Sequence, residues 1–226
     1  KAADGAGFDA TPVVVDGVIY IGDSDGVIHA VGLAQGATVW TKSFDESSFA
    51  AGAAVKNNRL YIGDLSGIVR CLATADGEEL WSADLGGEVY AGPMPYGDAL
   101  LVTSESGTLA SFDAADGSER WRFQIDAPLR CTPTIADGRV MLAGCDSLLH
   151  IIDATTGKQL QTVEIDGPTG STPATHGDRV YFGTESGTFF AIDIPQNDGK
   201  PRVAWTFRNP RRGQPIRSAA AISDNV

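Results

Sequence analysis

The chain has 226 residues, with 17 Lys and Arg against 29 Asp and Glu, and therefore a net charge of −12 at pH 7. Its length allows one or two ordinary domains, and its 42% hydrophobic and 20% charged residues are typical of a globular protein. No apolar run approaches the roughly 18 residues of a membrane span, and the acidic balance argues against binding to nucleic acid, which needs clustered Lys and Arg.

A repeat of about 40 residues runs through the whole chain. Trp40, Trp81 and Trp121 are 41 and 40 residues apart, and Trp205 follows 84 residues later, which is two periods plus a four-residue insertion. A glycine precedes each of the first three tryptophans by four residues, and the register continues to Gly157, where Gln161 replaces the tryptophan. A fixed period of this length is the signature of a repeat architecture. The predicted units are 8–47, 48–87, 88–126, 127–167 and 168–208, with 209–226 as the start of a sixth.

Each unit is predicted to contain four short strands. In the third unit we expect strands over 91–95, 99–103 and 108–112, followed by a fourth that carries Trp121 and Phe123. Asp-Gly and Gly-Asp pairs recur between the strands because tight hairpins need residues that tolerate positive φ. Second strands such as Val18–Ile21 are continuously apolar, which indicates that both faces of each sheet are covered.

Four-stranded units of this length, covered on both faces, are typical of β-propeller blades. The predicted fold is therefore all-β, a propeller of four-stranded antiparallel blades with five complete repeats and the opening strand of a sixth from Ile216. Propellers close with 4 to 8 blades, and we expect the chain to be part of one with seven or eight. The tryptophans on the fourth strands are predicted to fill the wedge between neighbouring blades and to serve a structural docking role. This assignment covers Trp40, Trp81, Trp121 and Trp205.

One segment carries a recognisable family motif. The run from Ser111 to Trp121 resembles the tryptophan-docking repeat of PQQ-type β-propellers, A-x-D-x-x-T-G-x-x-x-W. The run from Ile151 to Gly157 is similar but leads to Gln161, and Asp193 starts the motif again before a longer loop and Trp205. The resemblance covers essentially the whole chain. It implies a fold shared by quinoprotein dehydrogenases, the outer-membrane assembly lipoprotein BamB and propellers fused to signalling modules, so fold alone does not assign the function.

The resemblance allows the enzyme hypothesis to be tested on residues. Quinoprotein dehydrogenases of the family typically use adjacent disulfide-bonded cysteines, an aromatic floor for the quinone, and a calcium site built from Glu, Asn and Asp. Here Cys71, Cys131 and Cys145 are far apart in sequence, and every tryptophan is assigned to docking. Buried free thiols are favoured over a Cys131–Cys145 bridge. We therefore predict no catalytic residue, metal ligand or cofactor in this chain. PQQ and calcium belong only to the alternative that the chain is part of a dehydrogenase whose active site lies elsewhere.

Two sets of residues are candidates for binding. The segment 208–217 holds four of the 17 basic residues, and its Pro and Gly place it on an exposed connection. Its arginines either pair with neighbouring carboxylates or contact an acidic partner; the candidates are Arg208, Arg211, Arg212 and Arg217. The position before each first strand varies between repeats and is expected to ring one mouth of the central channel. Candidates there are Asp9, Tyr90 and Arg130. The three histidines lack metal-ligand spacing and are expected to be structural or to face solvent.

The favoured function is a non-catalytic propeller, similar to BamB, that serves as a protein-binding or assembly scaffold. The resemblance implies a periplasmic or otherwise extracytoplasmic location, with any lipid anchor outside this sequence, and a protein partner in a membrane or cell-envelope complex. Two alternatives stay open. One is part of a PQQ-dependent dehydrogenase that oxidises alcohols or sugars, and the other is a ligand-sensing propeller attached to a signalling module.

Overall fold

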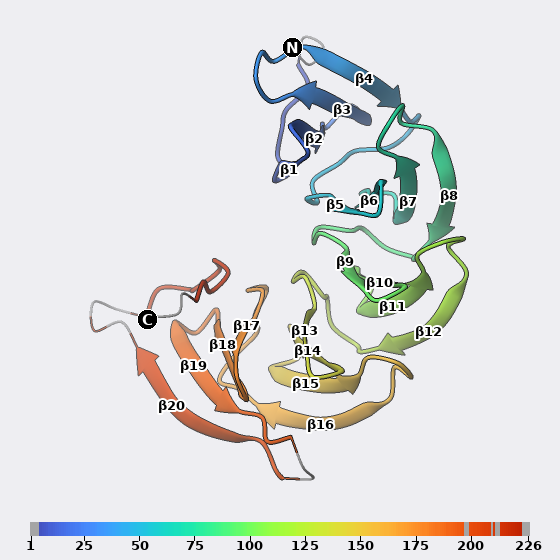
Figure 1. The fold of residues 1–226 in the computed structure, drawn as a ribbon. Helices are drawn as coiled ribbons and strands as arrows, with labels where there is room; N and C mark the ends of the chain where they lie inside the picture. Colours follow the sequence, from blue (N-terminus) through green and yellow to red (C-terminus); the bar gives the residue numbers. More distant parts are fainter. Residues whose placement is uncertain (1–4, 197–198, 209, 211–212, 223–226) are drawn as a thin grey trace. The chain divides into compact units, whose positions relative to one another are not determined.

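The computed structural model describes residues 5–196, 199–208, 210 and 213–222. All regular secondary structure in this part of the chain is β-strand, and its 20 strands form five four-stranded sheets. Within each sheet the spatial order of the strands follows the chain, so the first strand lies at one edge and the fourth at the other (Figure 1). The predicted all-β blade architecture is confirmed, and the sheets are called blades 1 to 5.

The strand bounds repeat closely from blade to blade. Blade 1 consists of β1 (Val13–Val15), β2 (Val18–Gly22), β3 (Val27–Gly32) and β4 (Thr38–Ser43). Blade 2 consists of β5 (Ala54–Lys56), β6 (Arg59–Gly63), β7 (Ile68–Ala73) and β8 (Glu79–Asp84). Blade 3 consists of β9 (Met94–Tyr96), β10 (Ala99–Thr103), β11 (Thr108–Asp113) and β12 (Glu119–Gln124). Blade 4 consists of β13 (Thr134–Ala136), β14 (Arg139–Ala143), β15 (Leu148–Asp153) and β16 (Gln159–Glu164). Blade 5 consists of β17 (Ala174–His176), β18 (Arg179–Gly183), β19 (Thr188–Asp193) and β20 (Arg202–Arg208).

The chain divides into two compact units. Unit 1 comprises Lys1–Ser106 and Ala110–Arg120, and unit 2 comprises Gly107–Leu109 and Trp121–Val226. Inside unit 1 the first strand β5 contacts both β1 and β9, and inside unit 2 β13 contacts β17. First strands of successive blades therefore lie side by side within each unit.

The hairpins between first and second strands are tight and have the expected backbone conformation. Val15 pairs with Val18 across Asp16 and Gly17, whose φ angles are 50° and 77°. Lys56 pairs with Arg59 across two asparagines, which adopt φ angles of 51° and 59°. Positive φ at both central residues is the requirement of a type I′ turn, whose twist matches that of the strands. The recurring Asp, Asn and Gly residues thus fix the register of each hairpin.

The hydrophobic cores lie between successive blades. One core combines Tyr20, Ile28 and Trp40 of blade 1 with Leu60 and Ile62 of blade 2. Similar clusters join blades 2 and 3 in unit 1, and blades 4 and 5 in unit 2. The second strand β10 is buried at all five positions, as its apolar sequence predicts. Each blade therefore gains its stability from burial against its neighbours.

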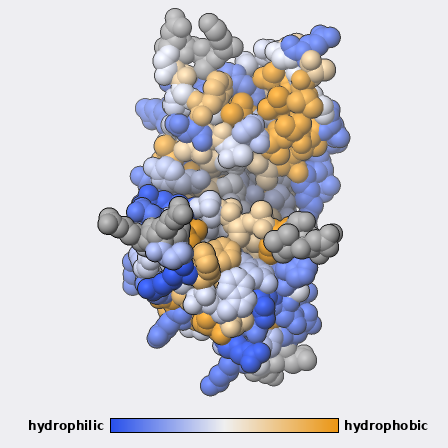
Figure 2. All heavy atoms as spheres, turned by 90° about the vertical axis from the view of Figure 1, so that its left-hand side faces the viewer, coloured by the Kyte–Doolittle hydropathy of each residue, from blue (hydrophilic) through white to orange (hydrophobic). Residues whose placement is uncertain are grey.

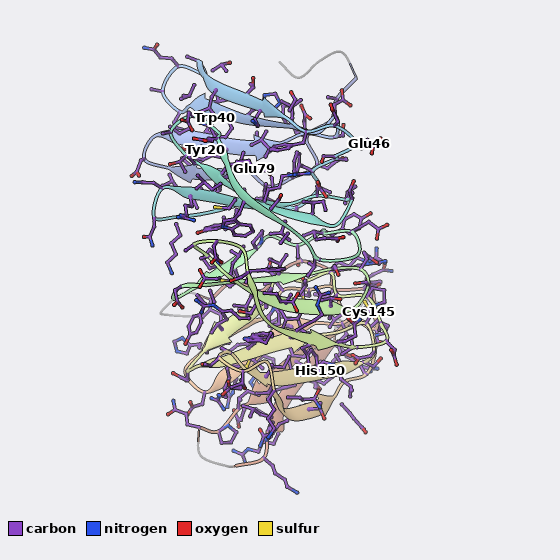
Figure 3. The ribbon with its side chains drawn as sticks, turned by 90° about the vertical axis from the view of Figure 1, so that its right-hand side faces the viewer. Tyr20, Trp40, Glu46, Glu79, Cys145 and His150 are labelled. Atoms are coloured by element: carbon purple, nitrogen blue, oxygen red, sulfur yellow. The ribbon has the colours of Figure 1, made fainter. Side chains whose placement is uncertain are left out.

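A tryptophan occupies the outer part of three of these joints. The indole N–H of Trp40 donates to the carbonyl oxygen of Thr74 at 2.9 Å. Trp81 donates to the carbonyl of Ala114, and Trp121 to that of Ala154, both at 3.2 Å. Trp40 and Trp81 are only 9% and 8% exposed. Figure 3 shows Trp40 lying next to Tyr20, and the two ring centroids are 5.9 Å apart.

A glycine forms the seat for each of these indoles. A Cβ atom at Gly77 would lie 2.8 Å from the Trp40 ring, and one at Gly117 would lie 2.6 Å from the Trp81 ring. Both glycines also have φ near +75°, a conformation that L side chains rarely adopt. The glycine four residues before each tryptophan is thus needed to receive the tryptophan of the preceding blade.

A β-bulge aims the indole at its seat. The pairing between third and fourth strands shifts register next to Trp40, where Ala30 faces Trp40 but Val31 faces Thr38. The same shift occurs beside Trp81 and Trp205, and beside Gln161. An extra residue in one strand bends it and turns side chains to a new direction. At the Gln161 joint the amide nitrogen donates to the carbonyl of Gly199 at 3.1 Å, in the lengthened loop of blade 5.

Trp205 differs from the other three tryptophans. Its side chain is 44% exposed, and its rings contact Tyr181 and Phe189 of its own blade. The docking role predicted for Trp205 is therefore not seen in the described chain, because a docked indole needs the glycine and carbonyl of a following blade. At the other end, a Cβ at Gly36 would meet no atom within 4 Å. In Figure 2, hydrophobic residues gather in the upper part of the view.

One strand prediction is corrected. The first strand of blade 3 is predicted over 91–95, but β9 covers Met94–Tyr96. The strand extends to Tyr96 because Tyr96 pairs with Ala99 across a two-residue loop, and the chain before it bonds to blade 2 through Val89 instead of to β10. A further strand is predicted within 216–226. Residues 216–222 form none, and the rest of this prediction is untested. Asp224, Asn225 and the adjacent end residues lie outside the described part.

We predict that Trp81→Ala lowers the free energy of unfolding by about 3–5 kcal/mol, because it leaves a cavity between blades 2 and 3. Trp205→Ala serves as the matched control and should cost clearly less, since nearly half of its side chain is already exposed. Urea unfolding of the two variants measures both changes. A loss below about 1 kcal/mol for Trp81→Ala would show that the indole does not hold the joint.

Candidate functional site

The loops that lead into the first strands share one construction. A buried or half-buried residue donates its N–H to the turn after the second strand of a neighbouring blade. Phe49 donates to the carbonyl of Asp23 at 3.0 Å, Val89 to Asp64 at 3.1 Å, and Ile216 to Thr184 at 3.0 Å. The residue that follows this anchor is exposed or half-buried. It differs from repeat to repeat and is called the anchored loop position.

The predicted channel-mouth residues occupy this exposed edge. Tyr90 follows the anchor Val89 in unit 1 and is 47% exposed. Asp9, also in unit 1, is exposed, and so is Arg130 in unit 2. Each of the three therefore has a side chain that solvent can reach at the end of a blade. Their role in binding stays a prediction.

Two arginines and one glutamate form a charged cluster in unit 2. Arg217 donates from Nε and Nη2 to the two carboxylate oxygens of Glu185, both at 2.9 Å. The Arg217 hydrogen bond lowers the pKa of Glu185, and the charges of Arg217 and Arg130 add to this effect. Arg217 is nevertheless 73% exposed, so its guanidinium stays open to solvent on one side.

Arg208, the last residue of β20, pairs with the carboxylate of Asp166, which follows β16. Its Nη2 lies 2.7 Å from Oδ2 of Asp166, and its Nε donates to Thr188 at 2.8 Å. Burial raises the pKa of Asp166, but hydrogen bonds from Thr188, Thr184 and Arg208 outweigh it, so this pKa is lowered overall. Both described arginines of the basic segment thus pair with neighbouring carboxylates. Arg211 and Arg212 lie outside the described residues.

The sequence did not reveal a set of polar contacts that hold the turns after the second strands. Asp64 is fully buried, and its Oδ1 accepts the N–H groups of Ser66 and Ile68. Its Oδ2 accepts from Ser47 at 2.7 Å and from Arg70 at 3.2 Å. The available signal was the aspartate at the same turn in blade 1, but the partners come from strands and loops that only the fold brings together.

The histidines at one repeat position belong to the same contacts. His29 lies 2.8 Å from Asp23, and His150 lies 2.8 Å from Asp146 and 2.9 Å from Gln159. Phe8 and Phe123 meet these imidazoles edge-on. Each imidazole therefore supports a turn rather than facing an open cleft. The cysteines Cys71, Cys131 and Cys145 are free thiols, and burial raises the pKa of Cys131 to about 12.

The arrangement brings no cation-binding set of side chains together. Among residues 5–196, 199–208, 210 and 213–222, no group of three or more His, Cys, Asp or Glu side chains is placed to hold a metal ion. The same residues contain no helix of the length and hydrophobicity needed to cross a bilayer.

A family model described as outer membrane protein assembly factor BamB matches three overlapping stretches of the sequence, 24–129, 66–148 and 126–223. These matches span most of the chain and include all four tryptophans. The chain belongs to this family of PQQ-like propeller repeats. The resemblance seen in the docking motif is thereby confirmed. A comparison with curated proteins gave no match.

Solved structures of this fold agree with the family assignment. BamB from Moraxella catarrhalis superimposes with a TM-score of 0.78 at 20% identity, over 89% of this chain and 65% of its own. The computationally designed Ika8 protein gives 0.79 at 19% identity, over 96% and 65%. Quinohemoprotein alcohol dehydrogenase from Comamonas testosteroni gives 0.73 at 16% identity, over 93% and 46%. At these identities the likeness shows the fold, and the chain spans less than two thirds of each structure.

We predict that Arg217→Ala raises the pKa of Glu185 toward its ordinary value, because the mutation removes the bidentate hydrogen bond and its charge. The pair stabilises the fold above the pKa of an unfolded glutamate, and this contribution is lost as the pH falls through the lowered folded pKa. NMR titration of the Glu185 carboxyl carbon measures the shift. Arg202→Ala, which removes a partner of Asp193 instead, should leave Glu185 unchanged; an equal shift in both variants contradicts the pairing.

Proposed function

We propose that the protein is a non-catalytic scaffold of the cell envelope, which binds another protein through the loop ends of its blades. The observation that carries the proposal is the match of the BamB family model over residues 24–223. The family implies a role in outer-membrane protein assembly and a location outside the cytoplasm. The partner is then a component of such an envelope complex.

The placement of side chains supports a binding surface at the loop ends. Polar and charged residues within the blades are engaged in turns and joints, as Asp64 and His150 illustrate. Exposed aromatic and arginine side chains, which are enriched in protein interfaces, instead occur at the anchored loop positions. Tyr90 and Arg217 are of this kind. Arg217 pairs with Glu185, but its exposed guanidinium can still donate hydrogen bonds to acidic groups of a partner.

A PQQ-dependent dehydrogenase is the second candidate, favoured by the 0.73 TM-score with quinohemoprotein alcohol dehydrogenase. The residues present do not fit the quinone and calcium site that the family implies. The three cysteines are separate free thiols, and the buried carboxylates Asp23 and Asp64 accept hydrogen bonds from their own turns. We therefore propose that this chain holds neither PQQ nor calcium.

Site-specific photo-crosslinking in the native host tests the scaffold. A benzophenone amino acid in the full-length protein replaces Tyr90 or, as a matched control, Tyr96 at the opposite end of the same first strand. Both tyrosines are exposed, at 47% and 39%. We expect a crosslink from position 90 to an outer-membrane assembly component, identified by mass spectrometry, and none from position 96.

Two outcomes would overturn the proposal. One is equal labelling, or none, from positions 90 and 96. The other is oxidation of alcohols or sugars by the purified full-length protein after reconstitution with PQQ and calcium, which would favour the dehydrogenase.

A further inference from the structure

A small pocket lies between blades 2 and 3, away from the anchored loop positions. Its walls come from the β5–β6 hairpin, the β9–β10 hairpin and the turn after β11, all within unit 1. Its volume is about 230 Å³. Because a water molecule occupies about 30 Å³ of liquid, this space equals about seven or eight waters and would hold a small molecule.

Two cations line the pocket without a carboxylate partner. Lys56 donates from Nζ to the carbonyl of Gly97 at 2.7 Å. Arg59 donates from Nη1 to the carbonyls of Ala114 and Ala115, at 3.0 and 2.7 Å. These carbonyls carry no formal charge. In the described part of the chain, neither Lys56 nor Arg59 forms an ion pair.

The nearest carboxylates are already engaged. Arg120 lies 2.8 Å from Asp98, which lines the pocket, and 2.7 Å from Asp113. Among the residues that line the pocket itself, Lys56 and Arg59 are cationic and Asp98 alone is anionic. The pocket lining therefore carries one excess positive charge, although the net charge of the chain is −12.

The same place between blades 4 and 5 serves as an internal comparison. Arg139 stands at the repeat position of Arg59 and likewise donates to two carbonyls of the following blade, those of Pro195 and Ile194. There, however, Ala136 replaces Lys56 and Met141 replaces Tyr61, and the side chains leave no space for a water molecule. The arginine is thus part of the joint in both places. Among the five first strands only that of blade 2 ends in a lysine, and the place between blades 4 and 5 lacks the open space.

We propose that this pocket binds a small anion whose charge is carried by carboxylate or phosphate oxygens, with Lys56 as the main cationic ligand. Ammonium and guanidinium groups form strong charge-assisted hydrogen bonds with such oxygens. Arg59 keeps its bonds to the two carbonyls and contributes positive charge and further N–H donors. The Asp98 carboxylate at the pocket wall favours a ligand that also carries a hydrogen-bond donor.

Titration of the 226-residue chain with inorganic phosphate and, separately, with succinate tests the proposal. The backbone amide signals of Asn57, Gly97 and Ala115 should shift saturably with one of these probes, and the responding probe distinguishes phosphate from carboxylate. Lys56→Ala and Lys56→Gln should each weaken binding at least about tenfold. Lys158→Ala, which removes an exposed lysine from blade 4, should leave the affinity unchanged.

Three results would overturn it. They are the absence of saturable shifts with both probes, retention of wild-type affinity in Lys56→Gln, and an equal loss in Lys158→Ala. The last would show general attraction of anions to surface lysines. Thermal unfolding of each variant checks that the fold is intact, and Lys56→Gln keeps most of the aliphatic stem if Lys56→Ala does not fold.

Discussion

The joints after blades 1, 2 and 3 depend on a hydrogen bond from an indole N–H to a main-chain carbonyl in the following blade. A four-stranded sheet with two apolar faces is unstable alone, and its neighbour must approach closely and in one register. Trp40, Trp81 and Trp121 meet both needs. The indole fills the outer space between two blades, and its N–H bonds to one carbonyl and so fixes the register. The seat requires glycine, so the tryptophan and the glycine of the next repeat form one device.

This device separates stability from recognition. The aspartates and histidines at the turns after the second strands hold loop geometry, as the Asp64–Ser47 and His150–Asp146 contacts show. The residue beyond each loop anchor takes no part in these turn contacts, and it differs between blades. Tyr90 and Arg217 are two of the different residues found at this position. A fold of this kind can acquire a binding surface one loop at a time without altering its cores.

Local features of this protein were predictable from its sequence, and contacts between distant segments were not. Asp-Gly and Asn-Asn turns and the 40-residue tryptophan spacing predicted the strands and their order, because hairpin chemistry acts over a few residues. The exposure of Trp205 and the pairing of Arg217 with Glu185 depend on segments far away in the chain. Likewise, Arg59 finds its carbonyls 55 and 56 residues later, a separation that no local pattern reveals. The bounds of β9 show a smaller error, because the strand runs on to Tyr96 beside its two-residue loop.

The empty seat at Gly36 and the exposed indole of Trp205 show that every joint has a direction. One side of a blade always donates, and the other always accepts, in the same register. A donor side that carries the tryptophan therefore fits, in principle, any acceptor side that carries the glycine, and the Gln161 joint is the exception. Duplication or loss of one whole 40-residue unit would leave the remaining joints with matching partners, whereas a change of half a unit would not. Such a gene can alter its number of blades in evolution without passing through an unfolded protein.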